Sequence, residues 1–331
     1  MEYILNKTYV KTTNGFKMND IKVDLDILPI KSSNLLISGI DYKSVVKSNF
    51  DSNIGLKSSE YNSTSIDVIG NKKIYVNCEF DSEYFISNEL NINLENNSKS
   101  DIFILFTGSK GINNFKIIVS ASKNCISNIS VINLSRVDSF ISIENKQSDN
   151  SNVLFNFIDL GGNLRVSNYY CELLGIKAIN YLNTIYMGKS NDRIDCNYYI
   201  KCIGENTNAY INSYGVLDDN SYKTYKGTID FVTGSRKSIG EEIEKCILLS
   251  NTCKSRSLPI LLCGEEDVIG NHGVSTGKLD NSQLFYLMSK GIEEIEAKKL
   301  IIMGNFNKII ENIDDEKIKQ KIIDKISDNL I

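Results

Sequence analysis

Short runs in which apolar and polar residues alternate extend along most of this chain from about residue 71 onward. In the first clear run, Ile74, Val76, Cys78 and Phe80 occupy every second position. A period of two puts such side chains on one face of a strand, so this run predicts a β-strand with one buried face. The same alternation recurs within residues 115–121, 139–143, 153–157 and 194–202. The sequence therefore predicts a mainly β core.

The segments between these runs are rich in glycine, asparagine, serine and aspartate, which favour turns. No helical period long enough for a crossover helix occurs before about residue 280, so the pattern excludes a doubly wound α/β sheet. Short strands separated by frequent turns favour a β-helix, a solenoid in which each rung buries its face against the next. There is no regular repeat length, and periodicity alone leaves an antiparallel sandwich or a barrel open.

Helical patterning begins near Asp280, which can act as an N-cap for the backbone N–H of Gln283. Gly291 is expected to end this first helix, and a second helix is expected to end at Gly304. A third helix is predicted from the four-residue spacing of four apolar residues, a stripe typical of packing inside the molecule. They are Ile318, Ile322, Ile326 and Leu330.

These patterns divide the chain into three parts. Residues 1–65 are expected to form an irregular lead-in with short strands, and residues 66–275 a β-helix core. Residues 276–331 are expected to form a small C-terminal helical domain.

Composition narrows the classes of partner and compartment. The 331 residues carry 37 lysines and arginines against 41 aspartates and glutamates, with no dense basic run, so a nucleic-acid partner is not expected. No apolar run reaches the ~18 residues of a transmembrane helix, and the first residues do not resemble a signal peptide. The eight cysteines form no CxxC pair, which is typical of free thiols in a reducing compartment. We therefore expect a cytoplasmic protein with no membrane partner.

His272 is the only histidine of the chain. A single imidazole excludes a Ser-His-Asp hydrolase or a two-histidine metal site elsewhere in this chain. Imidazole binds iron and titrates near neutral pH, although a lone histidine is more often a structural residue. The segment 270–277 contains several glycines but lacks the GxxxxGK(S/T) spacing of a phosphate-binding loop, so ATP binding is not expected.

Three cysteines near His272 in the sequence, Cys246, Cys253 and Cys263, could supply thiolates, which suit iron–sulfur clusters. Cys263 lies in an apolar run and is expected to be part of the core. Cys253 stands between Thr252 and Lys254 and is expected to be exposed. By contrast, Cys196 and Cys202 share an apolar strand face and are interpreted as packing residues.

From about residue 160 to residue 306 the chain resembles the SufB/SufD proteins, scaffold components of iron–sulfur cluster assembly. The resemblance depends on a series of short motifs in the family's order. They are residues 160–165 (LGGNLR), 215–221 (GVLDDNS), 225–229 (YKGTI), 237–238 (KS), 248–250 (LLS), Pro259, 267–268 (DV), 272–273 (HG) and 284–292 (LFYLMSKGI). Any one of them is weak, but the ordered series is specific.

The resemblance implies a right-handed parallel β-helix followed by a helical domain, and a protein without catalytic activity of its own. It implies that the helical domain docks the ATPase SufC, and that the end of the β-helix meets a sister SufB/SufD subunit or a second copy. No tightly bound cofactor is expected, although a transient iron–sulfur cluster fits such a scaffold. The docking residues implied are Leu284, Phe285, Tyr286, Met288, Gly291 and Ile292.

The two branches of the family differ near His272. This chain has His272-Gly273, as SufD proteins do, whereas SufB proteins carry His-Glu at this place. The position of a functional cysteine in SufB proteins corresponds to Glu244 in this chain. Cys246 lies two residues further on and would share the strand face of Glu244. The candidate cluster ligands are therefore His272, Cys253, Cys246 and Glu244, with His272 and Cys253 the leading pair. Because a cluster usually needs about four ligands, the site is expected to be completed across a dimer interface.

Two other functions stay open at this point. A β-helix enzyme acting on polysaccharide would have the same strand pattern, although such enzymes are usually exported. A homodimeric scaffold that works without a sister subunit is also open, because the short lead-in lacks the N-terminal helical domain of longer family members.

Overall fold

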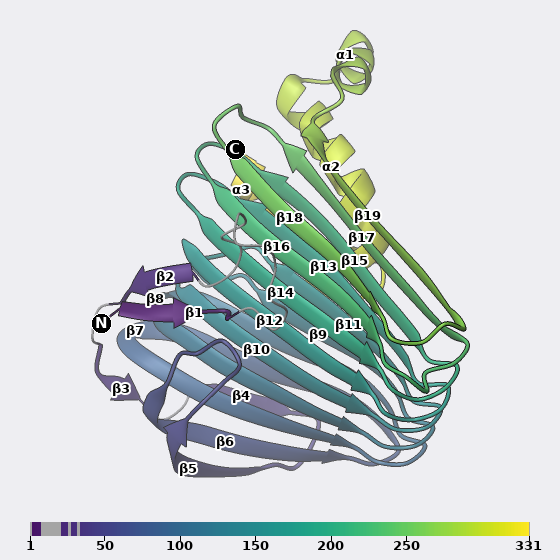
Figure 1. Ribbon diagram of the computed structural model, residues 1–331. Coiled ribbons are helices and arrows are strands. Elements are labelled where there is room, and N and C mark those ends of the chain that lie inside the picture. Colours follow the sequence, from purple (N-terminus) through teal and green to yellow (C-terminus); the bar gives the residue numbers. More distant parts are fainter. Residues whose placement is uncertain (1, 8–20, 26–27, 32–33, 331) are drawn as a thin grey trace.

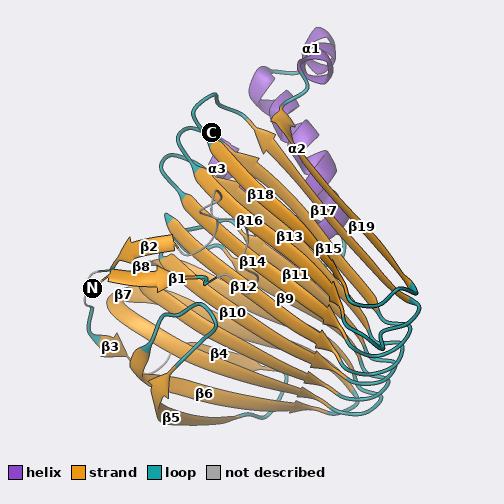
Figure 2. Cartoon of the chain, viewed as in Figure 1, coloured by secondary structure: helices purple, strands orange, loops and turns teal. Residues whose placement is uncertain are grey.

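The computed structural model describes residues 2–7, 21–25, 28–31 and 34–330. The chain coils into a stack in which the strands of successive turns pair in parallel (Figure 1; Figure 2). Each turn contributes one strand to each of two faces, so strands two apart in the sequence pair with each other. The expected parallel β-helix is confirmed, and the alternatives of an antiparallel sandwich or a barrel are wrong.

The first face is a ladder of parallel strands that begins with the first halves of two long strands. Its members are β7 (Asn71–Leu94), β8 (Lys99–Ala121), β9 (Ile126–Asn133), β11 (Asn152–Asp159), β13 (Ile179–Gly188), β15 (Asn208–Leu217), β17 (Ser238–Leu248) and β19 (Val268–Lys278). β19 is therefore the last strand of this face.

The second face begins with the second halves of β7 and β8. It continues through β10 (Asp138–Gln147), β12 (Leu164–Leu173), β14 (Arg193–Cys202), β16 (Tyr222–Phe231) and β18 (Lys254–Cys263). Paired residues are 26 positions apart between Ser139 and Arg165 but 32 apart between Lys223 and Ser255. This variation in turn length explains why the sequence has no regular repeat.

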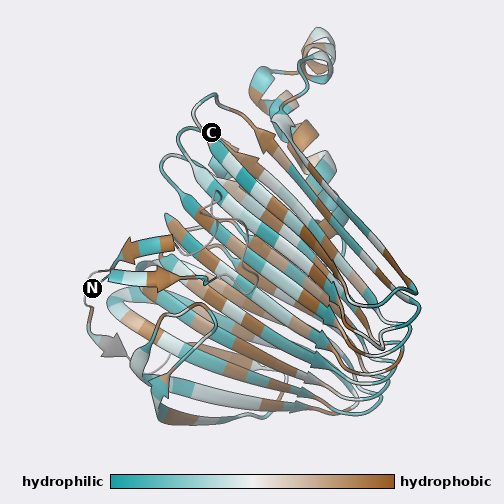
Figure 3. Ribbon diagram, viewed as in Figure 1, coloured by the Kyte–Doolittle hydropathy of each residue, from teal (hydrophilic) through white to brown (hydrophobic). Residues whose placement is uncertain are grey.

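Alternate side chains of each strand point into the stack and form its core. Ile74, Val76, Cys78 and Phe80 are all fully buried, as their spacing predicts. The core continues through the same position of later strands, and Cys196 and Cys202 belong to it, as expected. Figure 3 shows the result as apolar bands that cross successive strands. Burying these stripes against neighbouring turns is the main stabilising contribution to a solenoid.

Short strands make up the described part of the lead-in. They are β1 (Glu2–Leu5), β2 (Ile21–Asp24), β3 (Ile30–Lys31), β4 (Leu35–Ser38), β5 (Lys43–Phe50) and β6 (Ser58–Val68). Leu5 and Val23 pack with Phe140 and Val166 of the second face. β5 pairs with β6 in antiparallel fashion and is exposed along nearly its whole length, so it lies at the amino-terminal end of the stack. The predicted three-part division of the chain stays a prediction.

Three helices follow the last strand: α1 (Asn281–Ser289), α2 (Glu294–Ile310) and α3 (Glu316–Leu330). Asp280 caps α1 as expected, accepting hydrogen bonds from the backbone of Ser282 and Gln283. Gly291 follows α1 with a positive φ of 85°, a conformation that favours glycine at a helix end. None of the helices in the described residues is both long and apolar enough to cross a membrane.

The expectation that the second helix ends at Gly304 is wrong, because α2 continues through this residue to Ile310. The glycine costs about 1 kcal/mol relative to alanine. Phe306, Ile309 and Ile310 beyond it are buried against the first face of the solenoid, and this packing outweighs the cost. Ile318, Ile322 and Ile326 of α3 are buried in the same cluster, so the predicted stripe packs within the molecule.

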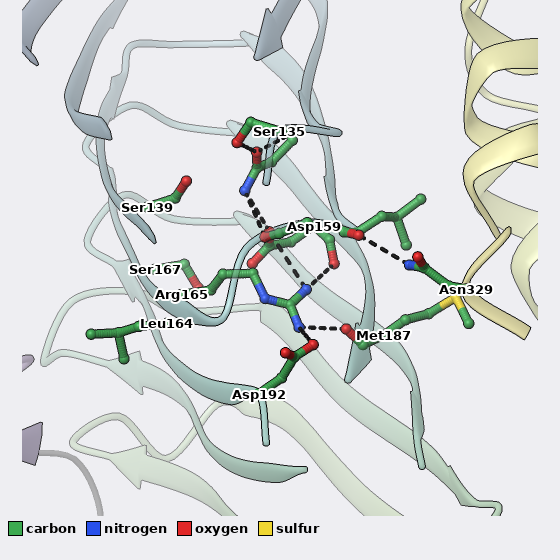
Figure 4. Close-up of polar contacts among 12 residues, drawn as sticks. Ser135, Ser139, Asp159, Leu164, Arg165, Ser167, Met187, Asp192 and Asn329 are labelled. Atoms are coloured by element: carbon green, nitrogen blue, oxygen red, sulfur yellow. Dashed lines mark hydrogen bonds and ion pairs between the residues drawn. The ribbon is translucent and has the colours of Figure 1, made fainter. Parts of the chain in front are cut away.

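A buried arginine and an asparagine of α3 both bind the corner between β11 and β12 (Figure 4). Arg165, at the start of β12, donates to the carbonyl oxygens of Asp159 and Met187 and lies 3.2 Å from a carboxylate oxygen of Asp192. The carbonyl oxygen of Leu160 accepts a hydrogen bond of 3.0 Å from Asn329 of α3. The segment from Leu160 to Arg165 therefore connects the corner between β11 and β12 to the helical domain.

Candidate functional site

The carboxyl-terminal end of the solenoid is formed by β17, β18 and β19. β19 forms its ladder with β17, and its residues from Ile269 to Lys278 are exposed. Strands in the middle of the stack have a neighbouring turn on each side, whereas the stack ends at β18 and β19 (Figure 1). An edge strand with free backbone groups is a natural site for pairing with another chain. We call β18 and β19 the open end.

His272 lies on β19 and is exposed. It pairs in register with Glu242 of β17, so the two side chains lie on the same side of the sheet. Gly270, two residues before His272, identifies this side: a Cβ there would touch Phe231 and Leu261 of the core. His272 is thus on the interior-facing side of the last strand of the first face.

Glu242, Glu244 and Cys246 of β17 all lie on that interior side and are buried. Glu244 forms an ion pair with Lys223 of β16 and accepts a hydrogen bond of 2.7 Å from the hydroxyl of Tyr186. Lys223 also donates to Ser257 of β18 at 2.9 Å. The pair therefore links β13, β16, β17 and β18 inside the stack.

Glu242 is held differently from Glu244. Its Oε1 atom accepts a hydrogen bond of 2.9 Å from Tyr225, and no ion pair holds it among the described residues. The Oε2 atoms of Glu242 and Glu244 are both buried without a hydrogen-bond partner among these residues. Burial raises the pKa of Glu242 from 4.5 to about 8, because the charged form is poorly solvated there. Burial also raises the pKa of the Cys246 thiol, so this cysteine is poorly suited to act as a free thiolate.

Two glycines make room for this polar cluster. A Cβ on Gly215 would overlap the ring of Tyr186, and a Cβ on Gly227 would lie 2.6 Å from the carboxylate of Glu242. Both glycines belong to motifs of the family resemblance, at 215–221 and 225–229. Their lack of a side chain is what allows the tyrosine and the glutamate to fit inside the stack.

An apolar surface lies on the helices that follow the open end. None of the residues of α1 is buried, and Phe285, Tyr286 and Met288 are 75%, 60% and 42% exposed. Ile295 and Leu300 of α2 are also exposed, whereas Leu284 and Ile292 are half-buried. Figure 1 shows α1 standing away from the strands. We call Phe285, Tyr286, Met288, Ile295 and Leu300 the helical patch.

Comparison with known families identifies the architecture. Residues 79–305, more than half of the chain, match the SUF system FeS cluster assembly, SufBD core domain. The chain belongs to the SufBD family. The matched residues include β17 to β19, His272 and all of α1, so both the open end and the whole helical patch lie within the family's core.

Individual relatives match over shorter segments. This SufBD family member is 28% identical over 161 residues to the iron-sulfur cluster assembly protein SufD of Bacillus subtilis, a segment covering 49% of this chain and 37% of the relative. It is 25% identical over 175 residues to SufD of Escherichia coli, covering 52% and 40%. A SufBD family protein of Antithamnion, ycf24, is 25% identical over 167 residues, covering 50% and 56%. The chain therefore spans less than two thirds of the length of these relatives.

The structure reverses two expectations about cysteines in this SufBD family member. Cys253, expected to be exposed, is 7% exposed, and its thiol donates to the carbonyl oxygen of Ser250 at 3.3 Å. Cys263, expected to be core, is exposed, because it ends β18 on the last turn, where no further turn covers it. The polarity of the neighbouring residues in the sequence did not predict the exposure of either cysteine, because exposure depends on the turn of the solenoid to which each residue belongs.

The candidate ligands do not all converge. The loop that carries Cys253 leaves β17 at Leu248, which pairs with Lys278, six positions and roughly 20 Å along β19 from His272. His272, Glu242 and Glu244 instead share the interior side of neighbouring strands. Among the described residues, no three histidine, cysteine or acidic side chains gather closely enough to hold a metal ion.

The sequence reasoning missed Lys223, Tyr186, Tyr225 and Glu242. A signal for them was present, because Lys223 and Glu242 occupy positions where the strand alternation calls for buried residues. Charged residues at such positions indicate either a functional cluster or a buried ion pair. The structure contains an ion pair, at Lys223 and Glu244, and a second buried carboxyl group, at Glu242, which accepts a hydrogen bond from Tyr225.

Proposed function

We propose that this chain is a non-catalytic scaffold subunit in iron–sulfur cluster assembly. It docks a SufC-type ATPase through the helical patch and a sister SufB/SufD subunit, or a second copy, through the open end. Membership of the SufBD family and the two named SufD relatives support the pathway. The iron–sulfur cluster is a transient cargo rather than a resident cofactor.

The single observation that carries the docking proposal is the exposure of α1. A helix of nine residues that buries none of its side chains, and yet carries Phe285, Tyr286 and Met288, gains little stability from its own chain. Exposed aromatic residues and methionine on a helix are typical of a surface that binds a protein partner. Lys290, Gly291 and Ile292 fix the turn between α1 and α2 and thereby orient the patch.

The open end supports the second part of the proposal. β19 is 11 residues long and, among the described residues, pairs in a ladder with β17 on one edge only; His272 lies on this strand. A second chain meeting this edge would bring further ligands next to His272, which suits a site that one chain cannot complete. His272 is the leading candidate ligand in this proposal, and Cys253 is a more distant candidate. Cys246 and Glu244 are further candidates and are buried on the neighbouring strand β17.

The docking proposal is tested by capture of a SufC-type ATPase on the immobilised chain. Phe285→Glu combined with Met288→Glu should reduce capture by more than about tenfold, because charges replace desolvated apolar contacts. Both positions are exposed, so the fold should be unaffected. Leu36→Glu on β4, at a residue 70% exposed, is the matched control and should retain capture. Equal capture by the double variant and the control would exclude the helical patch as the docking surface.

The ligand proposal is tested by anaerobic reconstitution with iron and sulfide. His272→Ala should lower the bound iron, whereas Cys253→Ser should do so only if its loop joins the site in the assembled complex. Identical iron in the wild type and both variants would remove these two ligands while leaving the docking proposal intact.

A further inference from the structure

A groove of about 420 Å³ lies between the end of α2 and the outer side of the first face. Side chains that point outward from β11, β13 and β15 line one side of it, and residues at the end of α2 line the other. None of the lining residues belongs to the open end or to the helical patch. Those that matter most are Tyr181, Asn183, Asn212, Tyr214, Lys308 and Asn312. We call this groove the α2 groove.

A ladder of asparagine side chains crosses the strands beneath the α2 groove. Each side-chain amide donates a hydrogen bond to the side-chain oxygen of the asparagine one turn earlier, over distances of 2.9 Å, 3.2 Å and 3.1 Å. Its members are Asn128, Asn156, Asn183 and Asn212. The next residue in register after Asn212 is Ile243, so the ladder ends at Asn212. The ladder therefore fixes the orientation of Asn183 and Asn212, the two members that line the groove.

These two carboxamides retain hydrogen-bonding capacity toward the groove. A carboxamide has two N–H donors and an oxygen with two lone pairs, and the ladder uses one donor of each group. The remaining N–H of Asn183 and of Asn212 can each donate to a carbonyl oxygen of a ligand. A carboxamide also has the same donor and acceptor groups as a peptide unit, so the ladder suits the backbone of a bound peptide.

Tyrosine rings accompany the ladder. Tyr181 stacks on Tyr210 of the next turn, with ring centroids 4.7 Å apart, and both are half-buried. Tyr214 is buried on the side of the groove next to α2, where the ammonium group of Lys308 lies 5.8 Å from its ring centroid. Rigid aromatic rings beside hydrogen-bond donors are typical of grooves that bind polyproline II segments.

The spacing of the ladder distinguishes between two peptide conformations. Neighbouring strands lie about 4.8 Å apart, so two turns of the solenoid extend roughly 9.6 Å along the groove. A β-strand repeats every two residues, or roughly 6.7 Å, which matches neither one turn nor two. A polyproline II segment repeats every three residues, or roughly 9.3 Å, and its carbonyl groups make no internal hydrogen bonds. The groove therefore suits a polyproline II segment.

Charge and composition indicate the kind of partner. Lys308 is exposed at the edge of the groove and forms no ion pair among the residues that the structure describes, so an acidic residue of the ligand can pair with it. This chain has only two prolines, Pro29 and Pro259, which are far apart in the sequence. A proline-rich segment in the groove must therefore come from another protein.

We propose that the α2 groove binds a proline-rich, acidic segment of another protein in the polyproline II conformation. Asn183 and Asn212 donate to carbonyl groups of the segment, its proline rings pack against Tyr181 and Tyr214, and its acidic residue pairs with Lys308. This binding activity goes beyond the proposed scaffold function and uses neither of the surfaces invoked there.

The test begins with selection of a phage-displayed library of random decapeptides on the immobilised full chain. The enriched peptides should carry prolines three residues apart and an aspartate or glutamate. The most enriched peptide, labelled with fluorescein, is then titrated by fluorescence anisotropy. Asn212→Asp, which replaces the donor by a charged oxygen of similar size, and Tyr181→Ala should each weaken binding by more than about fivefold. Lys308→Ala should weaken binding and reduce its dependence on salt.

Tyr170→Ala is the matched control. Tyr170 stacks on Tyr199 of the next turn with ring centroids 5.4 Å apart, as Tyr181 does on Tyr210, but it lies on the second face and outside the groove. This variant should bind the peptide within about twofold of wild type, and circular dichroism checks that every variant is folded.

Three results would overturn the proposal. They are no enrichment on the wild-type chain, enriched peptides without the proline spacing, and equal losses in Tyr181→Ala and Tyr170→Ala. Capture of the ATPase through the helical patch does not involve the α2 groove, so Asn212→Asp should retain it. Failure of the peptide site and failure of the proposed function therefore give different results.

Discussion

At the scale of single residues, the interior of the last turns is unusual for its buried charges. Lys223 of β16 and Glu244 of β17 are both 0% exposed and form an ion pair with each other. A buried ion pair contributes little net stability compared with apolar residues of similar size, but losing one partner leaves the other charge uncompensated. The pair therefore constrains the local sequence more than it stabilises the fold.

We predict that Lys223→Met destabilises the chain by about 3–5 kcal/mol, because it leaves the Glu244 carboxylate buried without its cation. The double variant Lys223→Met, Glu244→Leu should recover most of this loss, since neither charge is then buried. Urea unfolding followed by circular dichroism measures both. Equal losses in the single and double variants would mean that packing, not charge, sets the cost.

Glu242 makes stability depend on pH. Its pKa is raised from 4.5 to about 8 by burial, so the folded chain holds a proton that the unfolded chain has released between these values. The free energy of unfolding should therefore fall as pH rises from about 4.5 to 8, by up to about 1.4 kcal/mol per pH unit from this group, and level off above pH 8.

Urea titrations of the metal-free chain between pH 5 and 9 test this prediction. Glu242→Gln should remove this part of the slope. Its neighbour Glu241 lies on the opposite side of β17, so Glu241→Gln is the control and should keep the wild-type profile. A profile for Glu242→Gln that matches wild type would contradict the assignment.

At the scale of elements, the strands could be predicted and their stacking could not. Alternation located the buried side of β7, β8, β10, β11 and β14, because the period of two is a local property of each strand. The spacing from turn to turn varies, so no repeat was visible. The parallel arrangement needed the family resemblance as well as the pattern.

The errors share one physical cause. The exposure of Cys253 and Cys263 depends on the position of their turn in the stack, and the length of α2 depends on the packing of residues beyond Gly304 against the first face. Neither property is local. The same holds for the site: His272 was singled out from its type, but its register with the buried Glu242 appears only when β17 and β19 lie side by side.

The docking of α3 on the solenoid can be tested through one side chain. Ile322 is fully buried in the cluster that joins α2 and α3 to the first face, so Ile322→Ala should cost about 2–5 kcal/mol. Hydrogen exchange should become faster in α3 while the strands keep their protection. Ile323→Ala, at a half-buried neighbour on α3, should have a smaller effect on both quantities. Loss of protection throughout the strands would mean that the helices and the solenoid unfold as one unit.

At the scale of the whole molecule, the two ends of the stack are both edge strands, but they differ in sequence. At the amino-terminal end, β5 exposes Val45 and Val46 and carries Lys43 and Lys47. Lysines are typical of edges that are protected from pairing. β19 carries none before Lys278 at its end, and it exposes Ile269 and Val274. This asymmetry favours association through β19.

We therefore predict that the purified chain, of 37.2 kDa, associates into a dimer through the open end, with a mass by light scattering that approaches twice this value as concentration rises. Ile269→Lys combined with Val274→Lys should shift the equilibrium to the monomer, because a symmetric pairing brings the new charges of both copies together. Val45→Lys combined with Val46→Lys at the opposite end is the matched control, since these residues are 55% and 60% exposed on an edge strand of the same kind. It should leave the dimer intact.

A monomer at all concentrations would contradict the prediction and leave a sister subunit as the partner of β19. Dissociation by the β5 variant alone would place the dimer contact at the amino-terminal end of the stack.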